Sequence, residues 1–201
     1  MPQRENVTLI PLTVATIEES IRRAWEGKKY RPTSVLIGSR HVAKGIFEIP
    51  FVNYDNASGG TFMPLQRIIT KNQSVHRSAW QGLGDAFDMK FSPGMKPPQG
   101  KCFLAYDHMS EEGRAPEGFT VGKRYYFVEM DLDGVELTLK DPDKQLDANP
   151  VRAISMVSGL GQIRASLSSL REGKRWALCD AITNALHRRL AEYQTKQQQA
   201  A

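Results

Sequence analysis

Apolar residues near the N-terminus recur at the spacing of a helix. Four of them share one helical face: Ile17, Ile21, Ala24 and Trp25. Thr16 and Glu19 have the spacing of a capping box, in which two side chains satisfy backbone amides at the start of a helix. The pattern therefore predicts a short amphipathic helix that begins at Thr16 and ends near Gly27.

The pattern changes after Ser34 to short apolar runs that are typical of strands. Residues 35–37 and 46–52 are two such runs, and residues 61–70 form a third extended segment. Helical spacing of apolar residues returns over residues 74–88. The first half of the chain is therefore predicted to be a small antiparallel sheet with helices.

Residues 92–100 interrupt these patterns with three prolines and two glycines, a composition typical of a linker. We therefore divide the chain into an N-terminal α+β subdomain (residues 1–91), the linker (92–100), a β unit (101–157) and C-terminal helices (158–201). The predicted fold class is α+β, with an N-terminal helix, a small antiparallel sheet and a C-terminal helical pair.

The C-terminal segment reads as two helices separated by residues 172–174. The second helix carries an apolar stripe formed by Leu178, Ile182, Ala185, Leu186, Leu190 and Tyr193. Such a stripe packs against a sheet in most proteins, which is the favoured interpretation. The alternative is that the helix binds a partner or a second copy of the chain.

Residues 101–156 carry a recurring strand and turn pattern. An opening strand is followed by the sequence TVGK at residues 120–123, by Tyr125, and by the acidic turn Asp133-Gly134. This arrangement resembles a small SH3-like barrel found in many bacteriophage and prophage proteins. The resemblance implies an SH3-like architecture and a phage-type context, and that family shares no catalytic residues. Tyr125 and Phe127 are expected on one face of a strand.

The chain has 201 residues, a net charge of +5 and a sequence pI of about 9.2, which favours approach to phosphate-rich partners. Its Lys and Arg residues are scattered, so the charge is also explained by solubility. The two cysteines, Cys102 and Cys179, are too few for a disulfide framework and are expected to stay unpaired. The N-terminus is unlike a secretory signal and no apolar run has membrane length, so a cytoplasmic protein with no membrane contact is predicted.

Two segments interleave basic and aromatic residues, which is the combination that binds phosphates and stacks bases. The predicted nucleic-acid-binding residues are Lys28, Lys29, Tyr30, Arg31, Lys123, Arg124 and Tyr125. The same residues are equally explained by exposed charge beside strand-forming aromatics.

Other candidate chemistry is weaker. Asp85, Asp88 and Lys90 have the local spacing of a metal-dependent nuclease site, but lie in a predicted helix or loop. Cys102 and His108 are zinc-ligand types that lack a paired motif. Residues 158–161 precede a helix, where backbone amides can hold a phosphate, but are better explained as a helix cap. No metal and no cofactor is predicted.

The favoured interpretation is a non-catalytic, phage-type accessory protein that binds nucleic acid. The alternative is a protein-binding inhibitor of a host factor, or a virion or assembly component. A third class is an enzyme whose site is assembled in space and is invisible in a linear sequence. Binding is favoured over catalysis because no catalytic motif stands out.

Overall fold

The computed structural model describes residues 7–43, 45–54, 61–140 and 151–200. Its largest element is an eight-stranded mixed sheet with the strand order β1-β7-β8-β2-β3-β10, in which β4 pairs with β3 and β5 with β2. These strands are β1 (Ile10–Pro11), β2 (Tyr30–Ala43), β3 (Ile46–Tyr54), β4 (Thr61–Met63), β5 (Gln66–Ile68), β7 (Lys101–Met109), β8 (Gly122–Asp131) and β10 (Val151–Ser158). A two-stranded sheet contains β6 (Phe87–Phe91) and β9 (Val135–Leu139).

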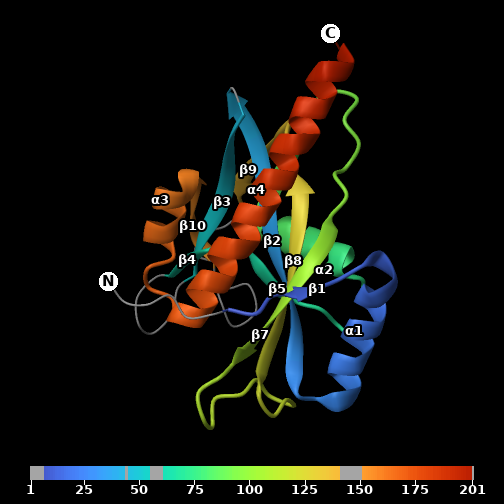
Figure 1. Ribbon diagram of the computed structural model, residues 1–201, viewed down its shortest axis with the longest axis vertical. Helices are drawn as coiled ribbons and strands as arrows, with labels where there is room; N and C mark the ends of the chain where they lie inside the picture. Colours follow the sequence, from blue (N-terminus) through green and yellow to red (C-terminus); the bar gives the residue numbers. More distant parts are fainter. Residues whose placement is uncertain (1–6, 44, 55–60, 141–150, 201) are drawn as a thin grey trace.

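Helices cover both faces of the large sheet. They are α1 (Val14–Gly27), α2 (Val75–Ala86), α3 (Gly159–Ser166) and α4 (Glu172–Ala200). On β8, the Tyr126 hydroxyl is 2.9 Å from Ser20 of α1, whereas Glu129 pairs with Arg188 of α4. Because positions 126 and 129 point to opposite faces of a strand, α1 and α4 lie on opposite sides of the sheet, as Figure 1 shows for α4.

The centre of the sheet is the parallel pair β2 and β8. Val35 lies opposite Phe127, and all four residues from Tyr125 to Val128 are buried. A strand with helices on both faces reads as a continuous apolar run, because both sets of alternating side chains enter a core. On the face shared with α1, the Ser34 hydroxyl is 2.9 Å from Ser78 of α2, so both helices cover that face.

The N-terminal helix begins earlier than predicted. Thr13 is its N-cap, and the Thr16 hydroxyl accepts the Thr13 amide at 2.9 Å. Thr16 therefore occupies the third helical position, and the predicted pairing of Thr16 with Glu19 was wrong. The Glu19 carboxylate instead accepts hydrogen bonds from Arg22 and Arg23, at distances that include 2.9 and 2.5 Å.

The other predicted helices are present. Ser74 caps α2 by accepting the Arg77 amide at 3.2 Å, and the helix ends where Phe87 enters β6. At the C-terminus, the break between the two helices lies at residues 167–171, earlier than predicted, because Glu172 already belongs to α4. The α+β class, the N-terminal helix and the C-terminal helical pair are thus confirmed.

The apolar stripe of α4 packs inside the chain, as the favoured interpretation held. Leu178, Ile182 and Ala185 are buried, and the Tyr193 ring stacks on His41 of β2 with a centroid distance of 4.3 Å. Self-association through this helix stays a prediction. No helix in the described part of the chain is long and apolar enough to cross a membrane. Cys102 and Cys179 are buried free thiols.

The predicted SH3-like barrel was wrong. β8 is a strand with Tyr125 and Phe127 on one face, but it pairs in parallel with β2 and antiparallel with β7 inside the large sheet. β9 joins β6 in the small sheet, and β10 lies beside β3. Within the described residues no set of strands closes into a barrel, because β8, β9 and β10 each pair with a strand from before residue 92, namely β2, β6 and β3. The turn at Gly134 is real, with a φ of 74° that favours glycine.

Phe127→Ala should lower the free energy of unfolding by about 3–5 kcal/mol, because it removes a large side chain from the core between sheet and helix. Phe127 is 1% exposed. The matched control is Phe91→Ala, whose side chain is 37% exposed and should cost much less. Urea denaturation of both variants measures this, and equal losses would contradict the burial argument.

Candidate functional site

The parallel pairing of β2 and β8 brings the two predicted basic segments together. Arg31 lies opposite Lys123 in the register of these strands. On the other side of β8, His108 of β7 lies opposite Lys123. Because neighbouring strands are about 4.8 Å apart, the three residues form a row about 10 Å long across three strands.

Lys174, in the first turn of α4, adds a fourth nitrogen-bearing side chain to this row. Its Nζ lies 5.2 Å from the centroid of the Tyr125 ring and 3.8 Å from the Met63 sulfur. A thioether is only a weak acceptor, so the ammonium has no oxygen partner among the described residues. Each of the four residues Arg31, Lys123, His108 and Lys174 is partly buried. The name anion pocket is used below for these four side chains together.

The charges of the anion pocket are not neutralised by described residues. None of Arg31, Lys123 and Lys174 forms an ion pair in the described part of the chain, and Arg31 Nε is buried without a hydrogen-bond partner. Burial lowers the pKa of Lys123, and the neighbouring Arg31 lowers it further. Burial lowers the pKa of Lys174 to about 7, with Lys123 as the second cause.

His108 stays neutral in this surrounding. Burial lowers its pKa to about 4, and the positive charges of Lys174, Lys123 and Arg171 contribute in the same direction. The imidazole stacks against Tyr125 with a centroid distance of 5.8 Å. At neutral pH the pocket therefore combines cations that repel one another with an uncharged imidazole, an arrangement that a bound anion would stabilise.

Only some of the predicted site residues reach this pocket. Arg31 and Lys123 line it, while Tyr125 is 2% exposed and forms its floor, where it is too buried to stack on a base. Arg124 and Tyr30 point to the opposite face, because alternate residues of a strand face opposite ways. There Arg124 donates to Asp107 at 2.5 and 2.7 Å, and its guanidinium lies 5.8 Å from the Tyr30 ring.

Lys28 and Lys29 lie in the exposed turn that follows α1, away from the row. Lys28 has a φ of 47°, and the carbonyl oxygens of Lys28 and Lys29 accept the Thr120 and Val121 amides. The main chain of this turn thus aligns β2 with β8. Sequence reasoning missed His108 and Lys174 as anion-binding residues. For His108 a signal existed, since it alternates with Tyr106 on the predicted strand.

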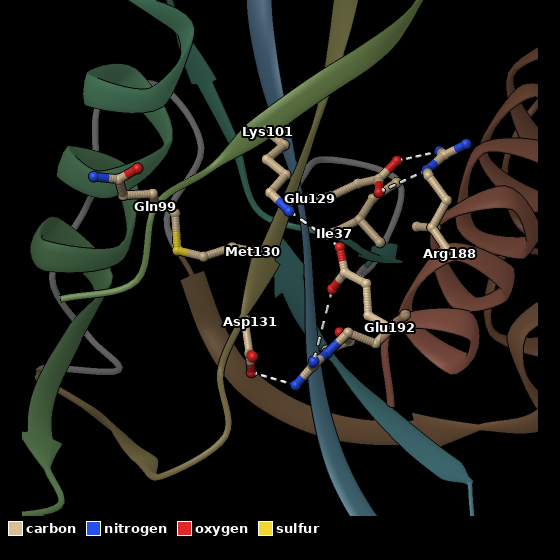
Figure 2. Close-up of a pocket in the computed structure, with 11 residues that line it drawn as sticks. Ile37, Gln99, Lys101, Glu129, Met130, Asp131, Arg188 and Glu192 are labelled. Carbon is tan, nitrogen blue, oxygen red and sulfur yellow. Dashed lines mark hydrogen bonds and ion pairs between the residues drawn. The ribbon is translucent and has the colours of Figure 1, made fainter. Parts of the chain in front are cut away.

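A cavity of about 60 Å³ lies between α4 and the sheet (Figure 2). Its charged side chains pair with one another. Arg188 donates to Glu129 at 3.0 Å, and Arg189 lies 2.5 Å from both Asp131 and Asp133. Lys101 lies 3.0 Å from Glu192. We call these seven residues the ionic network. Its charges neutralise one another, so its role is to hold α4 on the sheet.

The other candidate chemistry is not assembled. Asp85 pairs with Arg67, and burial raises the pKa of the Cys102 thiol to about 12, which keeps it protonated. Among the described residues no group of three or more His, Cys, Asp or Glu side chains is placed to hold a metal ion. Ser158 is the N-cap of α3, as the favoured interpretation held, although its side chain forms no capping hydrogen bond among the described residues. Its amide donates to Gln162 Oε1 at 2.7 Å and is therefore not free to bind a phosphate.

Comparison with solved structures shows where this fold occurs. The bifunctional NMN adenylyltransferase/ADP ribose pyrophosphatase of Francisella tularensis, solved with AMP and a Mn ion, matches with a TM-score of 0.50 and 8% identity over 88% of this chain and 47% of that one. A MutT NUDIX hydrolase of Burkholderia pseudomallei matches with a TM-score of 0.44 and 11% identity, over 71% and 99% of the two chains. An Ap4A hydrolase of C. elegans gives 0.45 and 11%, over 78% and 98%. No protein-family model matches the sequence, and no curated protein does.

These neighbours correct several expectations. The match to the Francisella structure at a TM-score of 0.50 agrees with a mixed sheet covered by helices, and not with the SH3-like barrel of phage proteins. The interpretation as a non-catalytic, phage-type nucleic-acid-binding accessory protein was wrong, as was the preference for binding over catalysis. The phage-type interpretation rested on the barrel, which the described strands do not form, and the solved structure that shares this fold at a TM-score of 0.50 is an enzyme. The error arose because the phage-type function was inferred from the resemblance to an SH3-like barrel, which covers only about a quarter of the chain.

Lys174→Met should stabilise the protein, by about 1–3 kcal/mol at pH 6, because it removes a poorly solvated ammonium. The folded pKa of Lys174, about 7, lies below the unfolded value of about 10.4. The destabilisation is therefore complete below pH 7 and fades as the pH rises towards 10. Urea denaturation at pH 6 and pH 9 should show the larger gain at pH 6. Lys196→Met, at an exposed position of the same helix, is the control and should change little.

Proposed function

We propose that the protein is a hydrolase that cleaves a phosphoanhydride bond in a small, nucleotide-type substrate, whose phosphates bind in the anion pocket. The observation that carries this proposal is the row of Arg31, Lys123 and Lys174, which no described carboxylate neutralises. The solved neighbours support it, because they include an ADP ribose pyrophosphatase and an Ap4A hydrolase.

Phosphate recognition follows from the donors in the row. Arg31 presents a planar guanidinium that can donate two parallel hydrogen bonds to one phosphate, and Lys123 acts as a point charge beside it. A row about 10 Å long accommodates more than one phosphate group along the strand-to-strand direction. The pocket thus suits a phosphate chain better than a single carboxylate.

The pocket also holds groups that can move protons. Water attacks phosphorus, the bond to the bridging oxygen breaks, and that oxygen leaves with the departing phosphate. His108 is neutral above about pH 4 and accepts the proton of the attacking water. Lys174, with a pKa of about 7, donates a proton to the leaving oxygen. Arg31 and Lys123 stabilise the negative charge of the transferring group.

The described residues do not supply a site for a catalytic metal ion. The Francisella structure contains a Mn ion, but the described residues of this chain offer no matching set of three ligands. Asp85 is the acidic residue of α2, and Arg67 occupies its carboxylate. The described residues therefore do not fit a protein-held metal, and each step above is assigned to side chains of this chain.

The proposal is tested by incubating the full chain with ADP-ribose, Ap4A and nucleoside di- and triphosphates at pH 7, and separating the products by chromatography. We expect at least one of these to be cleaved at an anhydride bond. His108→Asn should lower kcat by about 100-fold or more, because it removes the proton acceptor. Lys123→Ala should raise KM and lower kcat/KM.

The matched control is Lys90→Ala, which removes a lysine from the exposed face of β6. It should leave the kinetic constants unchanged. If the wild-type chain cleaves none of these compounds, with or without added divalent cations, the proposed function is wrong.

A further inference from the structure

The anion pocket differs from a metal-dependent phosphate site in the source of its positive charge. Arg31 and Lys123 face each other on adjacent strands, and Lys174 lies over the floor made by Tyr125. All three charges come from side chains. The described residues place no carboxylate group there that would hold a divalent cation.

We propose that the anion pocket binds a diphosphate group directly, without a bridging divalent cation, and that the bound diphosphate draws a proton onto Lys174. This inference rests on the proposed function for the identity of the site. The new claim concerns the charges that balance the bound diphosphate. The side chains of Arg31, Lys123 and Lys174 take the place of a metal ion, and Lys174 becomes fully charged by taking up a proton on binding.

The charged residues of the anion pocket disfavour the binding of a divalent cation together with the diphosphate. A metal ion carried in with a diphosphate would lie near Arg31, Lys123 and Lys174, all of the same sign. The nearby carboxylate of Glu111 is already paired with Arg171 and with Arg114. Repulsion between the metal and the side-chain cations should therefore weaken the binding of the metal complex compared with the free diphosphate.

Proton uptake follows from the groups that face Lys174. Lys123 and Tyr125 of β8 and His108 of β7 interact with Lys174 itself. Arg31 of β2, Tyr106 of β7 and Tyr54 of β3 interact with Tyr125 beneath it. Arg171, in the segment before α4, acts on His108. The tyrosines Tyr54 and Tyr125 have pKa values raised by burial and stay neutral. None of these groups supplies a negative charge at neutral pH.

Lys174 therefore titrates near neutral pH. Burial and Lys123 hold its pKa down to about 7 in the free protein, so part of the population is uncharged at pH 7.5. An adjacent diphosphate favours the charged form and raises this pKa. Binding should take up a proton, and affinity should fall as the pH rises from 6 to 8.5.

Isothermal titration calorimetry of the full chain with inorganic pyrophosphate tests both parts. Titrations in EDTA should show binding, and excess Mg²⁺ should weaken it. At pH 7.5, titrations in buffers of different ionisation enthalpy should give an uptake of a substantial fraction of one proton. Pyrophosphate that binds only in the presence of Mg²⁺ would overturn the proposal.

Two variants separate the roles of the lysines. Lys174→Met should weaken pyrophosphate binding about 10- to 100-fold and abolish the proton uptake, because a charge-assisted hydrogen bond and the titrating group are both lost. Lys123→Ala should weaken binding by a similar factor but keep part of the uptake. Lys196→Met should change neither quantity. Undiminished proton uptake in Lys174→Met would also sink the proposal.

The outcomes distinguish this inference from the proposed function. Hydrolysis of a nucleotide together with binding that depends on Mg²⁺ would refute the inference and leave the hydrolase assignment standing. Pyrophosphate binding in EDTA without cleavage of any substrate would do the reverse.

Discussion

The parallel pairing of β2 with β8 is the interaction on which the rest of the structure depends. It joins strands about ninety residues apart in the sequence, over a continuous register from Tyr30 opposite Gly122 to Ser39 opposite Asp131. Helices cover both faces of this pair, so its side chains enter a core on either side. The same register places Arg31 beside Lys123, and the anion pocket is thus a direct product of the strand pairing.

The basic residues of α4 that face this strand pair lie in two opposite electrostatic environments. In its middle, Arg188 and Arg189 are matched by carboxylates on β8 and in the following turn, and they tie the helix down. At its start, Lys174 lies near the cation of Lys123, and the contacts of its ammonium among the described residues are a thioether and an aromatic ring. The ion pairs of Arg188 and Arg189 and a lysine without an ion pair among the described residues therefore lie on the same helix. The ion pairs hold the helix, and with it Lys174, close to Lys123 despite the repulsion between the two lysines.

Local patterns in the sequence identified most of the elements but not their partners. The helix over residues 74–88 and the strand containing Tyr125 and Phe127 follow from periodicity alone. The pairing of that strand with β2 depends on long-range contacts that no local pattern encodes, and a short motif led instead to a barrel. The site was half visible: Arg31 and Lys123 stood out as basic residues, while Lys174 looked like part of a helix break. Strand alternation, which sends Tyr30 and Arg124 to the other face, was not applied to the basic segments.

The position of Lys174 depends on how the middle of α4 is anchored to the sheet. Lys174 and Arg188 are fourteen positions apart on one unbroken helix, so at 1.5 Å per residue the anchored segment lies about 21 Å from the lysine. A rigid rod of that length that tilts by about 5° at its anchored segment displaces its other end by about 2 Å. A shift of about 1 Å is enough to matter for chemistry. A small tilt of α4 caused by a change in the ion pairs of Arg188 and Arg189 therefore becomes a larger displacement at Lys174. The middle of this helix, about 21 Å away, thus controls the position of the Lys174 ammonium over the Tyr125 ring.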